Sequence, residues 1–159
     1  MSADARLDAE AAAYLASTRA PLRLACHSSD QWPVLLSLWF LVEDGKLWCA
    51  TPASAHVAKM LARDARCGFE ISENAAPYRG VRGRGRATLD ESRGKDVLRA
   101  LVRRYLESED TPFARWLLSR REPEVAIGIE IEKVTAWDFS ARMGVTRPSR
   151  LEGKTETTG

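Results

Sequence analysis

Residues 78–89 constrain the fold most, because they combine a strand pattern with a local concentration of positive charge. They read Tyr-Arg-Gly-Val-Arg-Gly-Arg-Gly-Arg-Ala-Thr-Leu. Side chains alternate between two faces in an extended chain, so Arg82, Arg84 and Arg86 share one face. The other face carries two glycines and an alanine, and glycine inside a strand usually marks a bulge or a close approach by another group. We therefore expect a strand here with such an irregularity.

Two interpretations of this arginine row stay open on the sequence. A row of guanidinium groups beside accessible backbone suits a planar, phosphorylated ligand. A solvated edge strand, whose charges prevent aggregation, would have the same pattern. Binding of RNA rests on this one short segment, and the formal net charge of only +2 argues against a general polyanion binder, so nucleic acid is not an expected partner.

Composition places the chain among ordinary globular proteins. With 159 residues it has the length of one domain, large enough for a core and a ligand cleft. Cys26, Cys49 and Cys67 lie in apolar stretches without metal-ligand spacing, which predicts reduced, buried thiols in a cytoplasmic protein. No apolar run approaches the roughly 20 residues of a membrane span, and no secretory signal begins the chain. His27 and His56 lie in different surroundings, so we expect no metal site.

Hydrophobic periodicity predicts a helix, five strands with one short helix inserted, two helices and a last strand. The expected elements are a helix at 4–18, strands at 22–26, 32–42, 47–51, 67–71 and 78–89, a short helix at 55–63, helices at 92–107 and after 111, and a strand at 124–138. Hairpin-like links imply an antiparallel sheet, and five or six such strands tend to close into a small barrel. We predict a mainly β, α+β domain over residues 1–143 and a mobile polar tail over 144–159.

Three local expectations are specific enough to test. Residues 32–42 should form one long strand, buried on much of both faces. Residues 43–46, Glu-Asp-Gly-Lys, should form a tight hairpin turn. The apolar side chains expected to face inward from the helix after residue 111 are Phe113, Trp116 and Leu117.

The corner between the strand at 47–51 and the helix at 55–63 is a candidate anion site. Thr51 and Ser54 offer hydroxyl groups, and a helix N-terminus offers free N–H groups and a partial positive charge. His56 and Lys59 lie in the first turns of that helix. In the alternative interpretation Ser54 only caps the helix and Lys59 is solvated.

No motif assigns catalytic residues. The sequence has no Gly-x-Ser-x-Gly elbow, and no helix start follows the glycines of 80–85 as a dinucleotide or Walker loop requires. Ser37 is a polar residue in an apolar run, where it either bonds internally or faces a ligand ring. We expect Trp39 in the core, although an aromatic residue near a flavin would look the same in the sequence.

Four segments together resemble the pyridoxamine 5'-phosphate oxidase-like family, the FMN-binding split barrels. They are the apolar strand at 33–40 with its hairpin and return strand, the stretch 54–67, the strand 79–87 with its Gly-Arg-Ala, and the closing strand that runs into 133–139. The resemblance covers roughly residues 20–140 and rests on the order and spacing of these soft motifs.

The resemblance implies a six-stranded antiparallel split β-barrel, a homodimer, and FMN in a groove at the dimer interface. Some members use a deazaflavin instead, and some bind haem. Carried over by position, the residues that border the isoalloxazine are Leu36, Ser37, Leu38 and Trp39, and those beside the ring or ribityl chain are Ala50 and Thr51. The phosphate segment holds Ser54, His56, Val57 and Lys59, and the later strand contributes Gly80 and Arg82.

The chain departs from the oxidases of this family in two places. Their Arg-Lys pair in the phosphate loop is replaced by residues among Ala55, His56 and Val57, so Lys59 or Arg82 would have to supply the charge. Their Arg-x-His element near the C-terminus is also missing, so pyridoxamine phosphate is not an expected substrate. The resemblance thus implies an FMN-dependent oxidoreductase acting on an unidentified small molecule. The alternative is a non-catalytic protein that binds or senses flavin, deazaflavin or haem.

Overall fold

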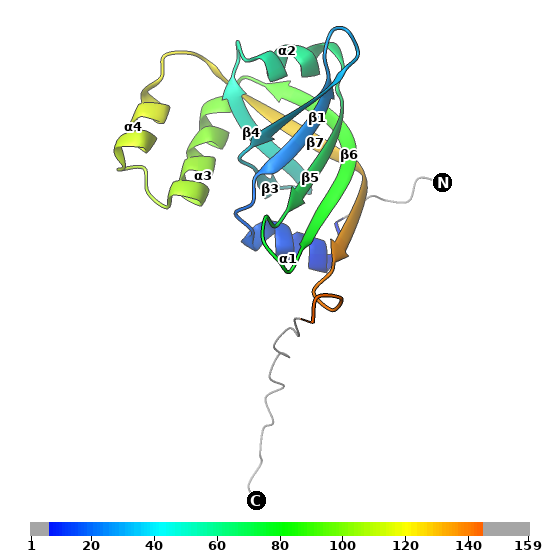
Figure 1. The fold of residues 1–159 in the computed structure, drawn as a ribbon. Coiled ribbons are helices and arrows are strands. Elements are labelled where there is room, and N and C mark those ends of the chain that lie inside the picture. Colours follow the sequence, from blue (N-terminus) through cyan, green and yellow to red (C-terminus); the bar gives the residue numbers. More distant parts are fainter. Residues whose placement is uncertain (1–6, 145–159) are drawn as a thin grey trace, which may run out of the picture.

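A computed structural model describes residues 7–144, which form seven β-strands and four α-helices (Figure 1). In chain order these are α1 (Ala9–Ser17), β1 (Leu22–His27), β2 (Pro33–Leu38), β3 (Leu41–Glu43), β4 (Lys46–Pro52), α2 (His56–Arg63), β5 (Arg66–Ser72), β6 (Arg79–Asp90), α3 (Gly94–Leu106), α4 (Pro112–Ser119) and β7 (Glu124–Asp138). The predicted class, mainly β with flanking helices, is confirmed. The predicted tail lies outside the described residues except for Gly144.

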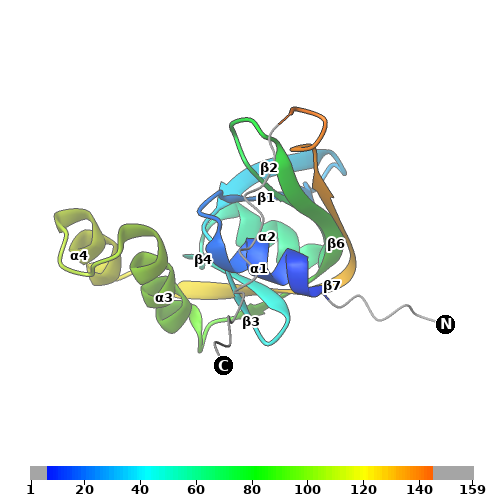
Figure 2. The same ribbon diagram turned by 90° about the horizontal axis from the view of Figure 1, so that it is seen from below.

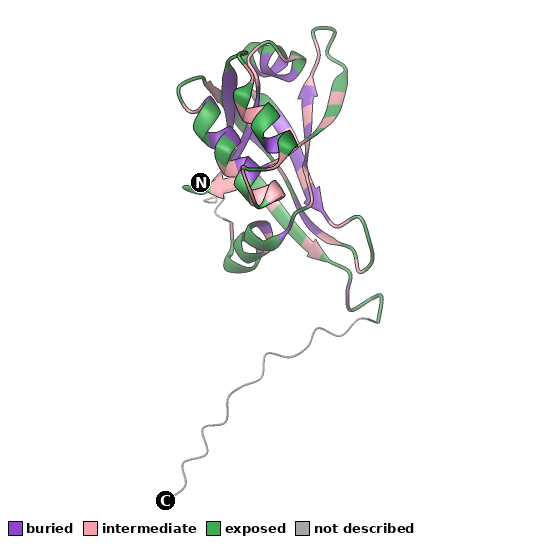
Figure 3. Cartoon of the chain, turned by 90° about the vertical axis from the view of Figure 1, so that its left-hand side faces the viewer, coloured by how far each residue is buried: buried purple, intermediate pink, exposed green. Residues whose placement is uncertain are grey.

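All neighbouring strands pair antiparallel in one sheet of order β2-β1-β5-β6-β7-β4-β3. The sheet curls around an axis, as the view from below shows (Figure 2), with α1 near one end and α2 near the other (Figure 1). The helices α3 and α4 lie to one side, away from β6 (Figure 1). Buried residues concentrate on the strands, whereas the outward sides of the helices are exposed (Figure 3).

The prediction of one long buried strand at 32–42 is wrong. The run forms two strands at opposite edges of the sheet, since β2 pairs with β1 and β3 pairs with β4. The sheet therefore has seven strands rather than six. Only Trp39 and Phe40 separate β2 from β3, so chain geometry keeps the two sheet edges within about 11 Å at that point. The outward residues of β2 are exposed, and among residues 7–144 no further strand pairs with this edge.

The prediction for the arginine strand is confirmed, and its edge-strand alternative is wrong. Strand β6 lies between β5 and β7, and its pairing with β7 shifts register between Arg84 and Gly85. A Cβ added at Gly83 would lie 2.2 Å from the carbonyl oxygen of Lys133, and one at Gly85 would lie 2.1 Å from that of Glu130. Only glycine allows this approach of the two backbones.

The predicted hairpin turn at residues 43–46 is confirmed. Asp44 and Gly45 both have positive φ, 52° and 72°, as the turn type that suits a twisted hairpin requires.

The three cysteines are free and buried, as predicted. Burial raises the pKa of the Cys67 thiol to about 11, so this thiol stays protonated at neutral pH. Burial also raises the pKa values of Cys26 and Cys49.

Three helix expectations need correction. Helix α1 begins at Ala9 rather than at residue 4, because Asp8 caps it by accepting a hydrogen bond from the Ala11 N–H at 2.7 Å. Ser54 does not cap α2, whose N-cap position is Ala55 without a side-chain bond. On α4, Phe113 and Trp116 point outward and are 51% and 56% exposed. No helix among residues 7–144 is long and apolar enough to cross a membrane.

Candidate functional site

A cationic hollow of about 580 Å³ lies on the outer face of the sheet, and we call it the outer groove. Its lining residues come from β1, β2, β5, β6 and β7: Arg23, Ala25, Leu35, Gly68, Phe69, Glu70, Arg82, Gly83, Arg84, Lys133 and Thr135. Strand pairing sets Arg84 directly opposite Lys133, and Arg82 between Glu70 and Thr135. Like charges opposite one another destabilise a sheet unless an anion or an acidic side chain compensates them.

One acidic side chain, Glu70, lines the groove directly opposite Arg82. Within the part of the chain that the structure describes, however, no carboxylate lies at ion-pair distance from Arg82, Arg84 or Lys133. Arg86, on the same face, differs, because its Nε lies 2.9 Å from Glu132 Oε1 and it does not line the groove. The predicted row of three arginines thus divides into two that are open to an anion and one that is paired.

The residues expected to border a flavin ring lie in two environments. Leu36 and Leu38 pack partly against the core, whereas Ser37 is exposed on the outward side of β2. Trp39 stacks on Tyr105 of α3 with ring centroids 5.0 Å apart and planes 5° apart, which favours its core interpretation. Leu35, which sequence analysis did not single out, lines the outer groove. Its alternation with Ser37 was the signal that could have found it.

The predicted anion corner is already occupied by acidic side chains. The Ser54 hydroxyl donates a hydrogen bond to Glu122 Oε1, which brings a carboxylate to the start of α2. Arg120 donates a hydrogen bond to the buried carboxylate of Glu124, four positions later in the chain. Burial raises the pKa of Glu124, and the positive charge of Arg120 works against that rise. A phosphate here would have to displace Glu122.

The other predicted residues of this corner differ in how far they are exposed to solvent. Thr51 and Val57 are buried, Ala50 is half-buried, and His56 and Lys59 are exposed. None of them lines the outer groove. Of the predicted site residues only Arg82 lies there, while Gly80 lines a different cavity.

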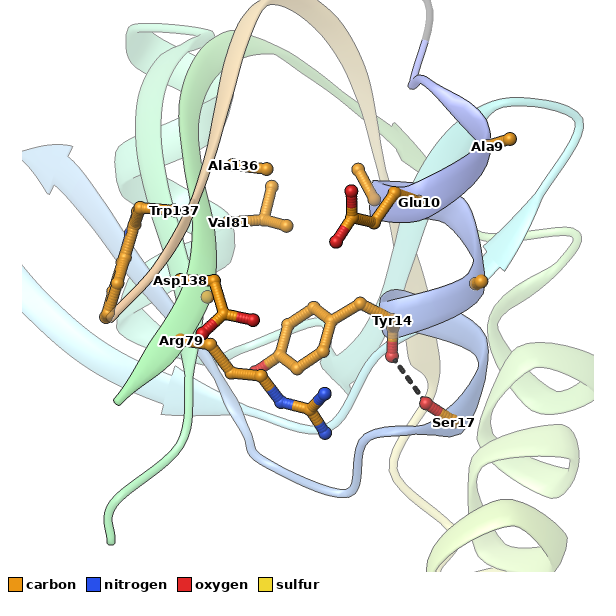
Figure 4. Close-up of a pocket in the computed structure, with 12 residues that line it drawn as sticks. Ala9, Glu10, Tyr14, Ser17, Arg79, Val81, Ala136, Trp137 and Asp138 are labelled. Carbon is orange, nitrogen blue, oxygen red and sulfur yellow. Dashed lines mark hydrogen bonds between the residues drawn. The ribbon is translucent and has the colours of Figure 1, made fainter. Parts of the chain in front are cut away.

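This second cavity, about 630 Å³, lies between α1 and the paired ends of β6 and β7 (Figure 4). We call it the helix cavity. It opens on the other face of β6, because Arg79 and Val81 line it while Arg82 and Arg84 line the outer groove. Sequence analysis missed it, since it forms between segments more than 60 residues apart. Among the described residues, no cluster of three or more His, Cys, Asp and Glu side chains could hold a metal ion.

Known protein structures share this architecture, although no family model and no curated protein matches the sequence. A conserved hypothetical protein from Mycobacterium tuberculosis is 27% identical with a TM-score of 0.71, and the alignment covers 94% of both chains. An F420 reductase is 15% identical with a TM-score of 0.63, over 76% of this chain and 93% of its own. The haem storage protein HutZ from Vibrio cholerae is 15% identical with a TM-score of 0.62, over 84% of this chain and 94% of its own.

Other structures at this level of similarity carry names that point to one group. A protein from Listeria innocua described as a pyridoxamine 5'-phosphate oxidase is 17% identical with a TM-score of 0.59, over 78% of this chain and 93% of its own. Similarity over most of the length of both chains confirms the resemblance that the four sequence segments indicated. The structural neighbours of this chain are the pyridoxamine 5'-phosphate oxidase-like split-barrel proteins, and the chain has their fold.

Proposed function

We propose that this protein is an FMN-dependent oxidoreductase that binds the phosphate of its cofactor in the outer groove. The observation that carries the proposal is the excess of positive charge in the groove lining, where four cations, Arg23, Arg82, Arg84 and Lys133, stand against one carboxylate, Glu70. None of the four lies at ion-pair distance from a carboxylate among residues 7–144. Structural neighbours of the same fold are described as an oxidase and a reductase, which supports redox chemistry.

The groove suits a phosphorylated, planar ligand in charge and in size. Guanidinium groups bind phosphate through paired, charge-assisted hydrogen bonds, and two arginines on alternate positions of one strand can do so together. The volume of the groove falls in the range typical of small-molecule sites. Leu35, which is 75% exposed, supplies apolar surface for a ring.

When bound, FMN would supply the hydride or electron transfer. The chain would hold the phosphate with Arg82 and Arg84, place the ring against Leu35, and exclude water from one side of it. We place the phosphate here rather than at residues 51–59 because Glu122 opposes an anion at that corner. The other assignments to the cofactor stay predictions: Leu36, Ser37, Leu38, Trp39, Ala50, Thr51, Ser54, His56, Val57, Lys59 and Gly80.

A comparison of two ligands tests the proposal, because riboflavin lacks only the phosphate of FMN. We expect Arg82→Ala and Arg84→Ala each to weaken FMN about 10- to 150-fold, the range for one charge-assisted hydrogen bond, and to leave riboflavin almost unchanged. Quenching of flavin fluorescence measures both affinities. Arg86→Ala is the matched control and should bind FMN like the parent protein, because Arg86 pairs with Glu132.

Two outcomes would overturn this placement: equal losses for FMN and riboflavin, or an Arg86→Ala variant as weak as the other two. Failure of FMN to bind the parent protein at micromolar concentrations would remove the FMN assignment itself.

The alternative function is non-catalytic binding of flavin, deazaflavin or haem. Structural neighbours are described as an F420 reductase and as a haem storage protein. The visible spectrum of the purified protein separates the cofactors, and turnover with reduced nicotinamides and electron acceptors separates an enzyme from a binding protein.

A further inference from the structure

Two of the three cysteines lie on neighbouring strands of the sheet. Strands β1 and β5 run antiparallel and side by side (Figure 1), and their pairing ends with Ala25 opposite Gly68. The next residue in the direction of the open end is a cysteine on each strand, Cys26 on β1 and Cys67 on β5. One further step in the same register therefore brings the two cysteines opposite each other.

The side chains of these two cysteines point to the same side of the sheet. Cys26 is 2% exposed and Cys67 is 6% exposed, and both belong to the core inside the curled sheet. An ionised Cys26 would raise the pKa of Cys67, as expected for two thiols that lie close together. Opposite residues of antiparallel strands have Cα atoms about 4.5–5.5 Å apart, and a disulfide needs about 4.4–6.8 Å. The two strands can therefore be cross-linked with little movement of the backbone.

A hollow of about 220 Å³ lies where the pairing of β1 with β5 ends, and we call it the thiol hollow. Its lining includes Cys26 and His27 of β1 and Arg66 and Cys67 of β5. Most buried cysteines of a protein core have no such opening beside them and are inert for that reason. Here a molecule of a few atoms that enters the hollow meets both cysteines.

The third cysteine, Cys49, is the competing partner, and its position is less suitable. It lies on β4, which β6 and β7 separate from β5 in the sheet, and it pairs with Ile127 of β7. It is 0% exposed and does not line the thiol hollow. An ionised Cys67 would raise the pKa of Cys49, so these two thiols interact across the interior, but no strand register sets them opposite each other among residues 7–144.

We propose that Cys26 and Cys67 form a site of reversible oxidation, at which hydrogen peroxide converts the two thiols into a disulfide that joins β1 to β5. In the first step the thiolate of one cysteine attacks the peroxide, which gives a sulfenic acid and one molecule of water after protonation. The sulfur of the second cysteine then attacks the sulfenic sulfur, so that the S–S bond forms and a second water leaves. In total the two thiols lose two electrons and two protons, and one peroxide becomes two waters.

Peptide mapping tests which thiols pair. Cleavage after Lys and Arg places each cysteine on its own peptide, 24–46, 47–59 and 67–79. We expect the full-length protein, after some hours in excess hydrogen peroxide, to give peptides 24–46 and 67–79 joined by a disulfide that dithiothreitol breaks. The reaction should be slow because burial raises the pKa of both thiols and leaves little thiolate. Three thiols that still react with iodoacetamide, a disulfide that contains Cys49, or sulfinic acid without a disulfide would each overturn the proposal.

Thermal unfolding gives a second measurement. A cross-link restricts the unfolded chain, so oxidation should raise the unfolding midpoint of the parent protein by about 5–15 °C, and dithiothreitol should reverse the rise. Cys49→Ala is the matched control and should show the same rise, whereas Cys26→Ala and Cys67→Ala should show none. A rise that persists in either of these two variants, or that disappears in Cys49→Ala, would contradict the pairing. Neither measurement involves a flavin, so the outcome stands apart from the proposed cofactor function.

Discussion

Single residues in β6 show how much a local pattern can predict. The glycines of the arginine strand predicted a bulge or a close approach, and the structure has both, at the register shift beside Gly85 and at the carbonyl oxygens that face Gly83 and Gly85. This prediction succeeded because its cause is local: a missing Cβ limits what can lie beside the backbone.

Substitution of Gly85 tests that cause. We expect Gly85→Ala to lower the free energy of unfolding by about 1–3 kcal/mol, the usual cost of forcing extra volume into a packed site, because the new Cβ would lie 2.1 Å from the Glu130 carbonyl oxygen. Gly68→Ala in β5 is the matched control, since its Cβ would meet nothing closer than 3.7 Å. Urea denaturation followed by circular dichroism measures both. Equal stabilities of the two variants would show that β6 and β7 are not held this closely.

Other residues could not be placed from the sequence because their partners are distant along the chain. Ser54 bonds Glu122, 68 positions away, and Arg79 lies over Tyr14 of the first helix. A hydroxyl next to a helix start looks like a cap whichever partner it finally bonds. The charges around Ser54 and around Arg79 therefore depend on tertiary contacts, which the hydrophobic periodicity of the sequence cannot predict.

Among the elements, those with an unbroken pattern were predicted well. The strand at 124–138 has the bounds of β7, and the arginine strand and the hairpin are confirmed. The run at 32–42 failed because a continuous apolar stretch does not say which edge each half joins. Helix α4 failed for a related reason: a helical stripe shows which side chains lie together, and not whether a neighbour covers them. Its buried contact is Ala114, next to α3, which leaves Phe113 and Trp116 exposed.

A pair of helix variants separates a covered stripe from an uncovered one. Leu101 of α3 is 1% exposed, and we expect Leu101→Ala to cost about 2–5 kcal/mol of unfolding free energy, as for other buried leucines. Trp116 of α4 is 56% exposed, and Trp116→Ala should cost less than about 1 kcal/mol, because little burial is lost. Thermal and urea unfolding of the two variants checks this order. A large loss in Trp116→Ala would mean that another surface covers α4.

At the scale of the whole molecule, the proposed cofactor site is open on one side. The outer groove lies on the outward face of the sheet, and the exposed edge strand β2 borders it with Leu35, which is 75% exposed. Trp32, just before β2, is 71% exposed. A redox ring laid in the groove of a single chain would keep much of its surface in water. We therefore propose that a second copy of the chain covers β2 and the groove, so that the cofactor lies between the two copies.

This proposal predicts that assembly and cofactor affinity change together. Trp32→Asp puts a charge on the face that the second copy would cover, and we expect it to convert a dimer into a monomer in size-exclusion chromatography with light scattering. Trp116→Asp is the matched control, because this tryptophan is also exposed but lies on α4, far from β2 (Figure 2). By linkage, FMN that binds only between two copies must stabilise the dimer, so its affinity should fall in the Trp32 variant and rise with protein concentration in the parent. A parent protein that binds FMN tightly as a monomer would contradict the shared site while leaving Arg82 and Arg84 as its phosphate ligands.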